Sequence, residues 1–318
     1  MVIYDMNEKF TDLRFDLSSW QTITNFFSNK ARPLERAQFN YLFGNGNPDK
    51  IISALKTFHN YDGGFGHGIE PDFHLPDSTP MATSIGLRIL DQLPNSKKRN
   101  DLIRDALKYL KGEFDLDRMG WYAVNRRVNK FPHAPWWEYD LKEDQTIIDK
   151  HWGNPTAELL CYCWTYRKFF SNWQIEPKIE HAIHYLEKKE IFPSEHEIYC
   201  FLHMYHHIPS DYQKRIKKKL TTAVQKLVIF DKNQWKEYVP QPVHFLVHPE
   251  DSLWGLTKQQ IYENLKYLHQ QLMKEGAIRP TWEWGQYPNH WSLAKKMWSG
   301  ILTLRALKML NNFTTQLI

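Results

Sequence analysis

The sequence predicts an all-α fold in which about six helical hairpins close into a ring. Apolar residues recur at helical spacing along most of the 318-residue chain. Windows with a one-sided apolar stripe alternate with windows that are apolar on most sides. The links between them repeat a glycine and aromatic pattern at intervals of roughly fifty residues, which is typical of a repeat array whose units cannot bury their apolar faces alone. Closing the array places the apolar helices inside.

Helix-starting residues, chiefly proline, mark where the first helices begin. Residues 1–16 show no committed pattern and are expected to form an arm on a single domain at residues 17–318. Helical spacing starts at Ser18, and a second helix follows Pro33. Pro48 suits the first position of a third helix, because the amide that proline lacks is not needed there. The third helix has a one-sided stripe and should lie outside.

The next helices repeat this alternation. Thr79 can cap a fourth helix that opens at Pro80 and is apolar on most sides, so we expect it to be buried. Residues 98–112 are amphipathic, and Asn154 opens another largely apolar helix. The remaining expected helices are residues 177–190, a helix with a capping box of Ser194 and Glu197, residues 211–230, residues 258–273 and a helix starting near Trp291.

One inner helix is expected to be irregular. Residues 238–256 should pair with the basic amphipathic helix before them, but Pro240, Pro242 and Pro249 interrupt the segment. We expect irregular chain there, with one short turn near Asp251–Leu256.

Composition narrows the class of protein. The formal charge of +5 is small for this length, and residues 214–219 hold much of it in a run that suits a solvated helix face, so no nucleic-acid partner is expected. The 3 cysteines make no disulfide framework. No signal-peptide pattern and no run of about eighteen apolar residues occurs, so we expect a cytoplasmic protein without a transmembrane segment.

The loop at residues 61–80 is the strongest site candidate. It holds four glycines and three prolines, so it cannot be the interior of a helix. The candidate catalytic residues on it are the carboxylates Asp62, Glu70, Asp72 and Asp77, and His67 and His74 are candidate substrate-binding residues.

These carboxylates suit acid–base chemistry. In a cavity walled by aromatic side chains, desolvation and like charge raise the pKa of a carboxyl group, so that one group donates a proton while another accepts one. The alternative is structural: Asp62 and Asp77 cap helices and satisfy loop amides, while Glu70 pairs with a surface arginine.

Several stretches resemble a known repeat. Residues 54–58, 62–66 and 77–83 resemble the repeat of terpenoid cyclases and protein prenyltransferase β subunits, and residues 284–304 resemble a later copy. This resemblance implies an α/α toroid with an inner and an outer ring of helices around a cavity, whose mouth is formed by the glycine–aromatic links. Residues 31–37 and 66–72 are similar to bacterial relatives of this repeat family.

The chemistry of those families does not carry over residue by residue. Squalene-hopene-type cyclases protonate through Asp-x-Asp-Asp, whereas residues 115–118 end in Arg118. The Asp, Cys and His zinc set of prenyltransferases has no counterpart, because Cys161 and Cys163 lie inside an expected helix.

Other residues could complete a site. The start of the helix at Asn154 could hold an anion, with Glu158 as a further candidate acid or base; simple helix capping is the alternative. Arg126, Arg127 and Arg279 could hold an acidic substrate, although solvated loop arginines are commoner. Aromatic residues in the links could stack on sugar rings or stabilise a carbocation. These candidate substrate-binding residues are Trp121, Tyr122, Trp136, Trp152, Trp282, Trp284 and Trp291.

No cofactor is expected. Zinc is a minor alternative, through His67, Asp72 and His74 or through His203 and His207, but neither spacing enforces a metal site.

The leading hypothesis is an enzyme that uses acid–base carboxylates on a small-molecule ligand, isoprenoid or glycan, in an aromatic-lined central cavity. Cyclase or prenyl-transfer chemistry follows from the resemblance alone. One alternative is a carbohydrate-active enzyme, either a glycosidase or a polysaccharide lyase. Another is a module that binds a ligand in the ring without turnover.

Overall fold

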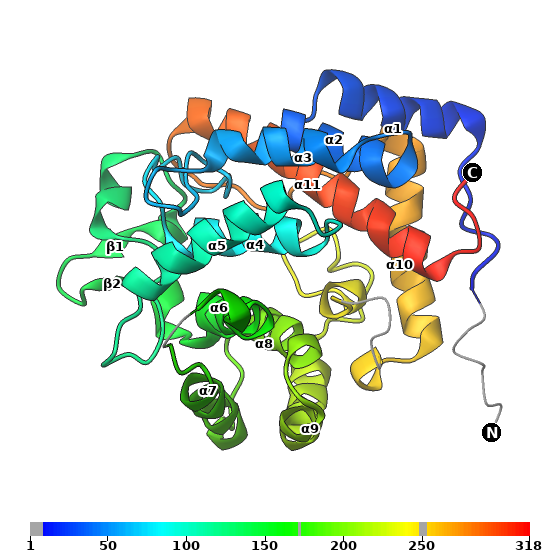
Figure 1. Cartoon of the computed structure of the whole chain (residues 1–318). Coiled ribbons are helices and arrows are strands. Elements are labelled where there is room, and N and C mark those ends of the chain that lie inside the picture. The colour runs from blue at the N-terminus through cyan, green and yellow to red at the C-terminus, as the bar shows by residue number, and fades with distance from the viewer. Residues whose placement is uncertain (1–8, 171–172, 248–252) are drawn as a thin grey trace.

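The chain is mostly helical in a computed structural model, which describes residues 9–170, 173–247 and 253–318. The described α-helices are Leu17–Asn29 (α1), Pro33–Phe43 (α2), Pro48–Leu55 (α3), Pro80–Asp91 (α4), Lys97–Gly112 (α5), Gly153–Thr165 (α6), Glu176–Lys188 (α7), Glu195–His207 (α8), Ser210–Leu227 (α9), Lys258–Glu275 (α10) and Pro288–Phe313 (α11). The predicted all-α class is confirmed (Figure 1).

Short elements fill the links. The 3-10 turns are Lys56–Phe58 (η1), Arg126–Lys130 (η2), Pro135–Trp137 (η3), Ile148–Lys150 (η4), Arg167–Phe169 (η5), Pro242–Phe245 (η6) and Leu253–Gly255 (η7). Strands Tyr139–Asp140 (β1) and Gln145–Thr146 (β2) pair antiparallel, Tyr139 opposite Thr146. The sequence analysis did not anticipate this hairpin. It is held by Asp149, whose carboxylate accepts hydrogen bonds from the backbone and hydroxyl of Thr146 and from the amide of Ala123.

Helix starts follow the capping signals. The hydroxyl of Thr79 accepts a hydrogen bond from the amide of Ala82 at 3.0 Å, which satisfies one of the free amides at the start of α4. Ser194 caps α8 in the same way. Glu197 does not complete the predicted capping box, because its carboxylate instead binds the amide of Gly153 and pairs with Lys189.

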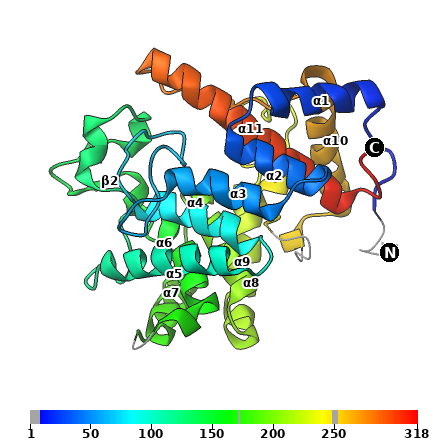
Figure 2. The same cartoon turned by 45° about the horizontal axis from the view of Figure 1, so that its top comes forward.

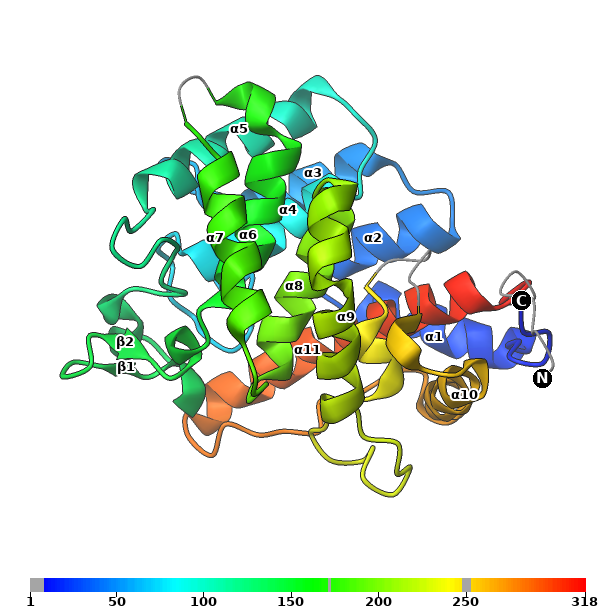
Figure 3. The same ribbon diagram turned by 90° about the horizontal axis from the view of Figure 1, so that it is seen from below.

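Amphipathic and buried helices alternate as expected. α6 is buried along almost its whole length, whereas α7 and α9 each bury one face. α6 contacts α8, α7 contacts α6, and α9 contacts both α8 and α7, so α7 and α9 form an outer layer over α6 and α8 (Figure 3). The same pairing joins α2 to α3 and α4 to α5.

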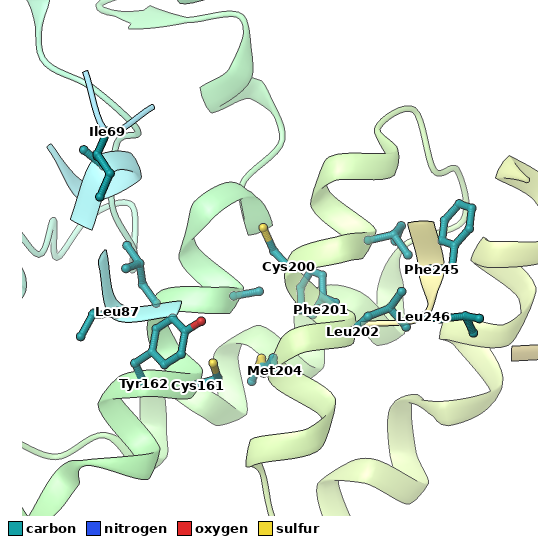
Figure 4. Close-up of a cluster of buried hydrophobic side chains, with 14 of the residues drawn as sticks. Ile69, Leu87, Cys161, Tyr162, Cys200, Phe201, Leu202, Met204, Phe245 and Leu246 are labelled. Carbon is teal, nitrogen blue, oxygen red and sulfur yellow. The ribbon is translucent and has the colours of Figure 1, made fainter. Parts of the chain in front are cut away.

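The hydrophobic core runs between the buried helices. Leu87 of α4, Tyr162 of α6 and Phe201 of α8 are each at most 1% exposed, and Phe245 of η6 continues the cluster (Figure 4). The free thiols of Cys161 and Cys200 lie in the same cluster (Figure 4). Side chains of these inner elements therefore pack directly against one another.

The ends of the chain meet. α11 contacts α2 and α10, and α10 contacts α1 (Figures 1 and 2). Within the expected arm, Phe10 pairs with Thr314, and the amide of Phe15 donates to the carbonyl of Leu317 at 2.7 Å. Contact between the first and last hairpins is what ring closure requires; the toroid itself stays a prediction.

The fifth hairpin lacks a regular inner helix. Its described residues form only the turns η6 and η7, in agreement with the irregular segment predicted at 238–256. Pro249 and Asp251 lie outside the described residues. Asn264 of α10, fully buried, holds η6 by accepting from the amide of Val243 and donating to the side chain of Gln241. None of the described helices is long and apolar enough to cross a membrane.

Candidate functional site

The loop at residues 61–80 folds back on itself with its backbone in close contact. Gly66 donates to the carbonyl of Phe58 at 2.8 Å, and Thr79 donates to the carbonyl of Phe65 at 3.1 Å. A Cβ atom on Gly66 would lie 2.2 Å from the carbonyl oxygen of Asp77, so only glycine fits there. This tight path separates the carboxylates of the loop into two groups.

Arg32 clamps the middle of the loop. Its guanidinium forms two hydrogen bonds to Glu35, at 2.7 and 2.8 Å. The remaining nitrogen, Nη1, donates to the carbonyls of Gly68 at 3.0 Å and Ile69 at 3.3 Å. Because Glu35 is buried, this ion pair fixes the start of α2 against the residues that immediately precede Glu70.

Asp72 is held by two indoles. Its Oδ1 accepts hydrogen bonds from the indole nitrogen of Trp284 at 2.8 Å and of Trp298 at 2.7 Å. Asp72 is only 4% exposed. Burial raises the pKa of Asp72 to about 6, although the indole hydrogen bonds act in the opposite direction by stabilising the carboxylate.

Glu70 lies beside Asp72. Its Oε1 accepts a hydrogen bond from the amide of Asp72 at 3.2 Å. Burial first, and then the negative charge of Asp72, raise the pKa of Glu70 to about 8, whereas Arg305 and Arg32 act to lower it. The two carboxyl groups therefore form a coupled pair whose pKa values lie on either side of neutral pH.

An aromatic and polar group faces this pair. Trp298 packs edge-on to Trp282, which packs edge-on to Tyr238, with ring centroids 5.1 and 5.2 Å apart. The Tyr238 hydroxyl shares a hydrogen bond of 2.5 Å with Nε2 of His196. Trp282 also lowers the pKa of Asp72, yet its buried indole N–H completes no hydrogen bond of normal geometry with the described residues.

Three side chains that solvent reaches lie near this group. His244 of η6 and Arg305 of α11 are exposed, and His203 of α8 is half-buried. Desolvation by the surrounding protein lowers the pKa of each histidine to about 4 and that of Arg305 to about 10. We take the water-accessible space that these side chains of α8, η6 and α11 border as the candidate hollow.

Glu158 lies at the same wall but in a fixed ion pair. Arg88 of α4 forms two hydrogen bonds to its carboxylate, at 2.7 and 2.6 Å, and the Tyr162 hydroxyl adds a third at 2.9 Å. Despite burial, the positive charge of Arg88 holds the pKa of Glu158 down at about 2. A carboxylate this acidic stays ionised at neutral pH, so its place here is to hold Arg88 between α4 and α6.

Three predicted residues of the loop lie apart from the carboxyl pair. Asp62, His67 and Asp77 line an open pocket of about 500 Å³ that also includes Glu113 and Arg127. Asp62 accepts hydrogen bonds from the amide of Gly64 and the hydroxyl of Ser78. Asp77 pairs with Arg127 at 2.6 Å. Asp62 thus satisfies a loop amide, as in the structural alternative, whereas Asp77 pairs with Arg127 and the cap of α4 is Thr79.

Several predicted substrate-binding aromatics lie elsewhere. Trp121 is fully buried, with its indole N–H donating to the carbonyl of Leu110 at 2.7 Å. The indole of Trp152 donates to the carbonyl of Arg118 at 2.9 Å. Tyr122 lies under the guanidinium of Arg118, and Trp136 packs partly buried against the core. Core packing accounts for Trp121 and Trp152.

The helix start at Asn154 is enclosed. Asn154 is buried, and its side-chain oxygen accepts a weak hydrogen bond from the thiol of Cys200 at 3.7 Å. Its amide donates to the carbonyl of His151 at 2.8 Å. The residues that were candidates for holding an anion here therefore already have partners within the protein.

The rest of the predicted set lies close to the pair. The ring centroid of Trp284 is 5.6 Å from His74 and 5.8 Å from Trp291. Burial lowers the pKa of His74. Because His67 binds Asn60 and Asp72 binds two indoles, the two do not form a zinc set with His74. No group of three or more His, Cys, Asp or Glu side chains in the described part of the chain is arranged to hold a metal ion.

Sequence reasoning missed the residues that come from distant elements. Four such residues were not predicted as site residues: Arg32, Arg88, Trp298 and Arg305. The sequence did, however, contain a pattern that could have identified Arg88 and Arg305. Each is a cation inside a helix that is otherwise apolar on most sides, and such a charge needs a partner or a water-filled space. Tyr238 gave no signal, because it lies in an irregular segment.

Comparison of the chain with protein-family models, curated proteins and solved structures finds no match.

Proposed function

We propose that this protein is an enzyme in which Glu70 and Asp72 act as general acid and general base on a ligand bound beside them. The observation that carries the proposal is the buried pair of carboxyl groups, in which Glu70 accepts from the amide of Asp72 and Asp72 accepts from two indoles. Burial raises the pKa of Glu70 to about 8 and that of Asp72 to about 6. At neutral pH Glu70 then holds a proton to donate, while Asp72 is ionised and can accept one. Perturbed, paired carboxyl groups of this kind cluster at functional sites.

The wall of the hollow favours a polar ligand. An isoprenoid needs an apolar surface, whereas Tyr238, His203, His244 and Arg305 present hydroxyl, imidazole and guanidinium groups. Trp282 adds an aromatic face next to them. Aromatic faces with hydrogen-bonding side chains suit the alternating apolar and polar faces of a sugar. We therefore favour the carbohydrate-active hypothesis over terpenoid-type chemistry.

The test is a substrate screen with matched variants. Neutral and acidic oligosaccharides are incubated with the protein, and products are followed by mass spectrometry. Glu70→Gln and Asp72→Asn should each abolish product formation, whereas Asp77→Asn, on the same loop but apart from the pair, should not. With a substrate in hand, kcat/KM should follow a bell-shaped pH profile with limbs near pH 6 and 8, set by the pair as a unit.

Two results would overturn this proposal. One is turnover that survives in both the Glu70→Gln and the Asp72→Asn variants. The other is a ligand that binds the parent protein and both variants with equal affinity and is never converted, which would establish the non-catalytic binding module instead.

A further inference from the structure

Arg305 lies next to the carboxyl pair on the same face of α11. It follows Trp298 by seven residues, which is two helical turns, and its guanidinium carbon lies 5.9 Å from the centre of the Trp298 ring. Trp298 in turn donates its hydrogen bond to Asp72. One indole ring therefore separates the guanidinium from the carboxylate.

Glu70 and Glu158 attract Arg305 only from a distance. Among residues that the structure describes, no carboxylate forms an ion pair with it. Burial, and then the positive charge of Arg88, lower the pKa of Arg305, and the attraction of Glu70 is too weak to offset them. By contrast, Arg88 has its own bidentate partner in Glu158. The guanidinium of Arg305 is thus exposed to solvent and has no ion-pair partner among the described residues, so it can bind an anion from solution.

The neighbouring groups do not supply a counter-charge. His203 and His244 have pKa values near 4, so they are neutral at pH 7. Lys308, one turn after Arg305, donates to the side chain of Gln92 at 2.7 Å, and burial and Arg305 lower its pKa to about 8. The carboxylates near Arg305 have other partners: Glu158 is paired with Arg88, and Asp72 accepts from two indoles. The side chain of Arg305 itself is exposed.

We propose that Arg305 binds an anionic group of the ligand, a carboxylate or a phosphate ester, and thereby sets the ligand against Glu70 and Asp72. The inference that Arg305 binds an anion depends only on the position and exposure of its side chain. The inference that this binding supports turnover rests on the proposed acid–base function. A guanidinium offers a planar pair of donors to a carboxylate or phosphate, and Lys308 adds positive charge behind it. The substrate class that fits is an acidic or phosphorylated carbohydrate.

The test measures how anions affect unfolding. Galacturonate, glucose 6-phosphate and inorganic phosphate are added to the protein, with galactose and glucose as uncharged controls, and the unfolding midpoint is followed. Ligands that bind only the folded state raise the midpoint, and the rise grows with the logarithm of the ratio of ligand concentration to Kd. At least one anion should stabilise the parent protein, while its uncharged counterpart does not. Comparing uronate with the two phosphates distinguishes a carboxylate from a phosphate ligand.

Variants assign the effect to Arg305. Arg305→Met should weaken the binding of the anion at least tenfold, and Arg305→Lys should weaken it less. Arg279→Met is the matched control, since Arg279 is exposed and pairs with Glu275. Without ligand, Arg305→Met should unfold at about the same denaturant concentration as the parent, because Arg305 is exposed and forms no ion pair among the described residues.

The outcomes separate this inference from the proposed function. The anion is also titrated into the Glu70→Gln, Asp72→Asn double variant, which should still bind it. The inference is overturned if no anion of the panel stabilises the parent, if Arg305→Met binds the anion as well as Arg279→Met does, or if Arg305→Met is markedly destabilised without ligand. Anion binding that persists while no acidic carbohydrate is ever converted would overturn the acid–base proposal alone.

Discussion

Trp284 donates its indole hydrogen bond to Asp72 across a sequence separation of 212 residues. Trp298, on α11, donates to the same carboxylate oxygen. The link before α11 and α11 itself thus orient a side chain that belongs to the loop before α4. The carboxylate of Asp72 is therefore oriented only when α11 and the link before it pack against the loop before α4.

Replacing Trp284 with Phe should raise the pKa of Asp72 above about 6, because one donor that stabilises the carboxylate is lost. A hydrogen bond to a charged group contributes about 1.5–3 kcal/mol, so the loss of stability should be larger at pH 8 than at pH 5, where Asp72 is protonated. Urea unfolding at both pH values measures this. Trp121→Phe is the control: it should destabilise the core equally at both pH values.

Glu70→Gln should change the pH dependence of stability. The folded-state pKa of Glu70, about 8, lies above its ordinary value of 4.5, so between these values the folded protein holds a proton that the unfolded chain releases. The parent therefore loses stability as pH rises from about 5 to 8. The variant should lose stability only up to about pH 6, because it keeps Asp72, whose pKa is also raised, and should be level above that pH. At pH 9 the variant should be more stable by a few kcal/mol. A parent and variant with parallel stability curves would refute the raised pKa.

Asp72→Asn should lower the pKa of Glu70, because the negative charge that opposes its ionisation is removed. The pKa should remain above 4.5, since burial is the larger cause of the shift. A pH titration of carboxyl carbon resonances by ¹³C NMR measures both values, with the Glu70 signal assigned by its loss in Glu70→Gln. An unchanged Glu70 pKa would mean that the two groups are not coupled.

Arg88→Met should destabilise the protein by about 3–5 kcal/mol at pH 7, because it leaves Glu158 charged and buried without its partner. The double variant Arg88→Met, Glu158→Leu should recover much of this loss. Since the pKa of Glu158 is about 2 when folded and 4.5 ordinarily, the ion pair stabilises above pH 4.5 and is lost as pH falls towards 2. Arg215→Met, which breaks exposed ion pairs, should cost less than about 1 kcal/mol.

Arg32→Met should loosen the loop that carries Glu70. It removes the donors to the carbonyls of Gly68 and Ile69 and leaves Glu35 buried without its ion pair. The amide of Ile69, bonded to Gly66, should exchange with solvent faster, while amides in the middle of α6 should not. The double variant Arg32→Met, Glu35→Gln should regain stability, because no buried charge is left unpaired, but the Ile69 amide should still exchange fast. If its slow exchange also returned, the buried charge of Glu35, and not the hydrogen bonds from Arg32, would explain the effect.

The helices were predictable because their signals are local. Thr79 as a cap, Pro80 as a first residue and the apolar stripes of α5 and α9 each depend on residues within one or two turns. Even the interruption at residues 238–256 followed from proline alone. Alternation of one-sided and buried helices then indicated which of them lie inside.

The composition of the site was only partly predictable, because its partners come from distant parts of the chain. Nothing near Glu70 and Asp72 distinguishes them from Asp62 and Asp77; the fold of the loop sends the first two towards α11 and the others towards Arg127. Likewise, the sequence alone suggests that Glu158 could act as an acid. The structure shows that Arg88, 70 residues earlier, binds its carboxylate.

The irregular segment around η6 depends on side chains for its shape. Buried amides of Gln241 and Asn264 tie η6 to α10 in place of helical hydrogen bonds, and Nδ1 of His244 accepts from the amide of Gln241. A residue exchanged for His244 must therefore replace this contact, although the apolar contacts of α4, α6 and α8 lie elsewhere. Under the proposed function, a change of ligand preference at η6 is thus coupled to the local fold of the turn that carries it.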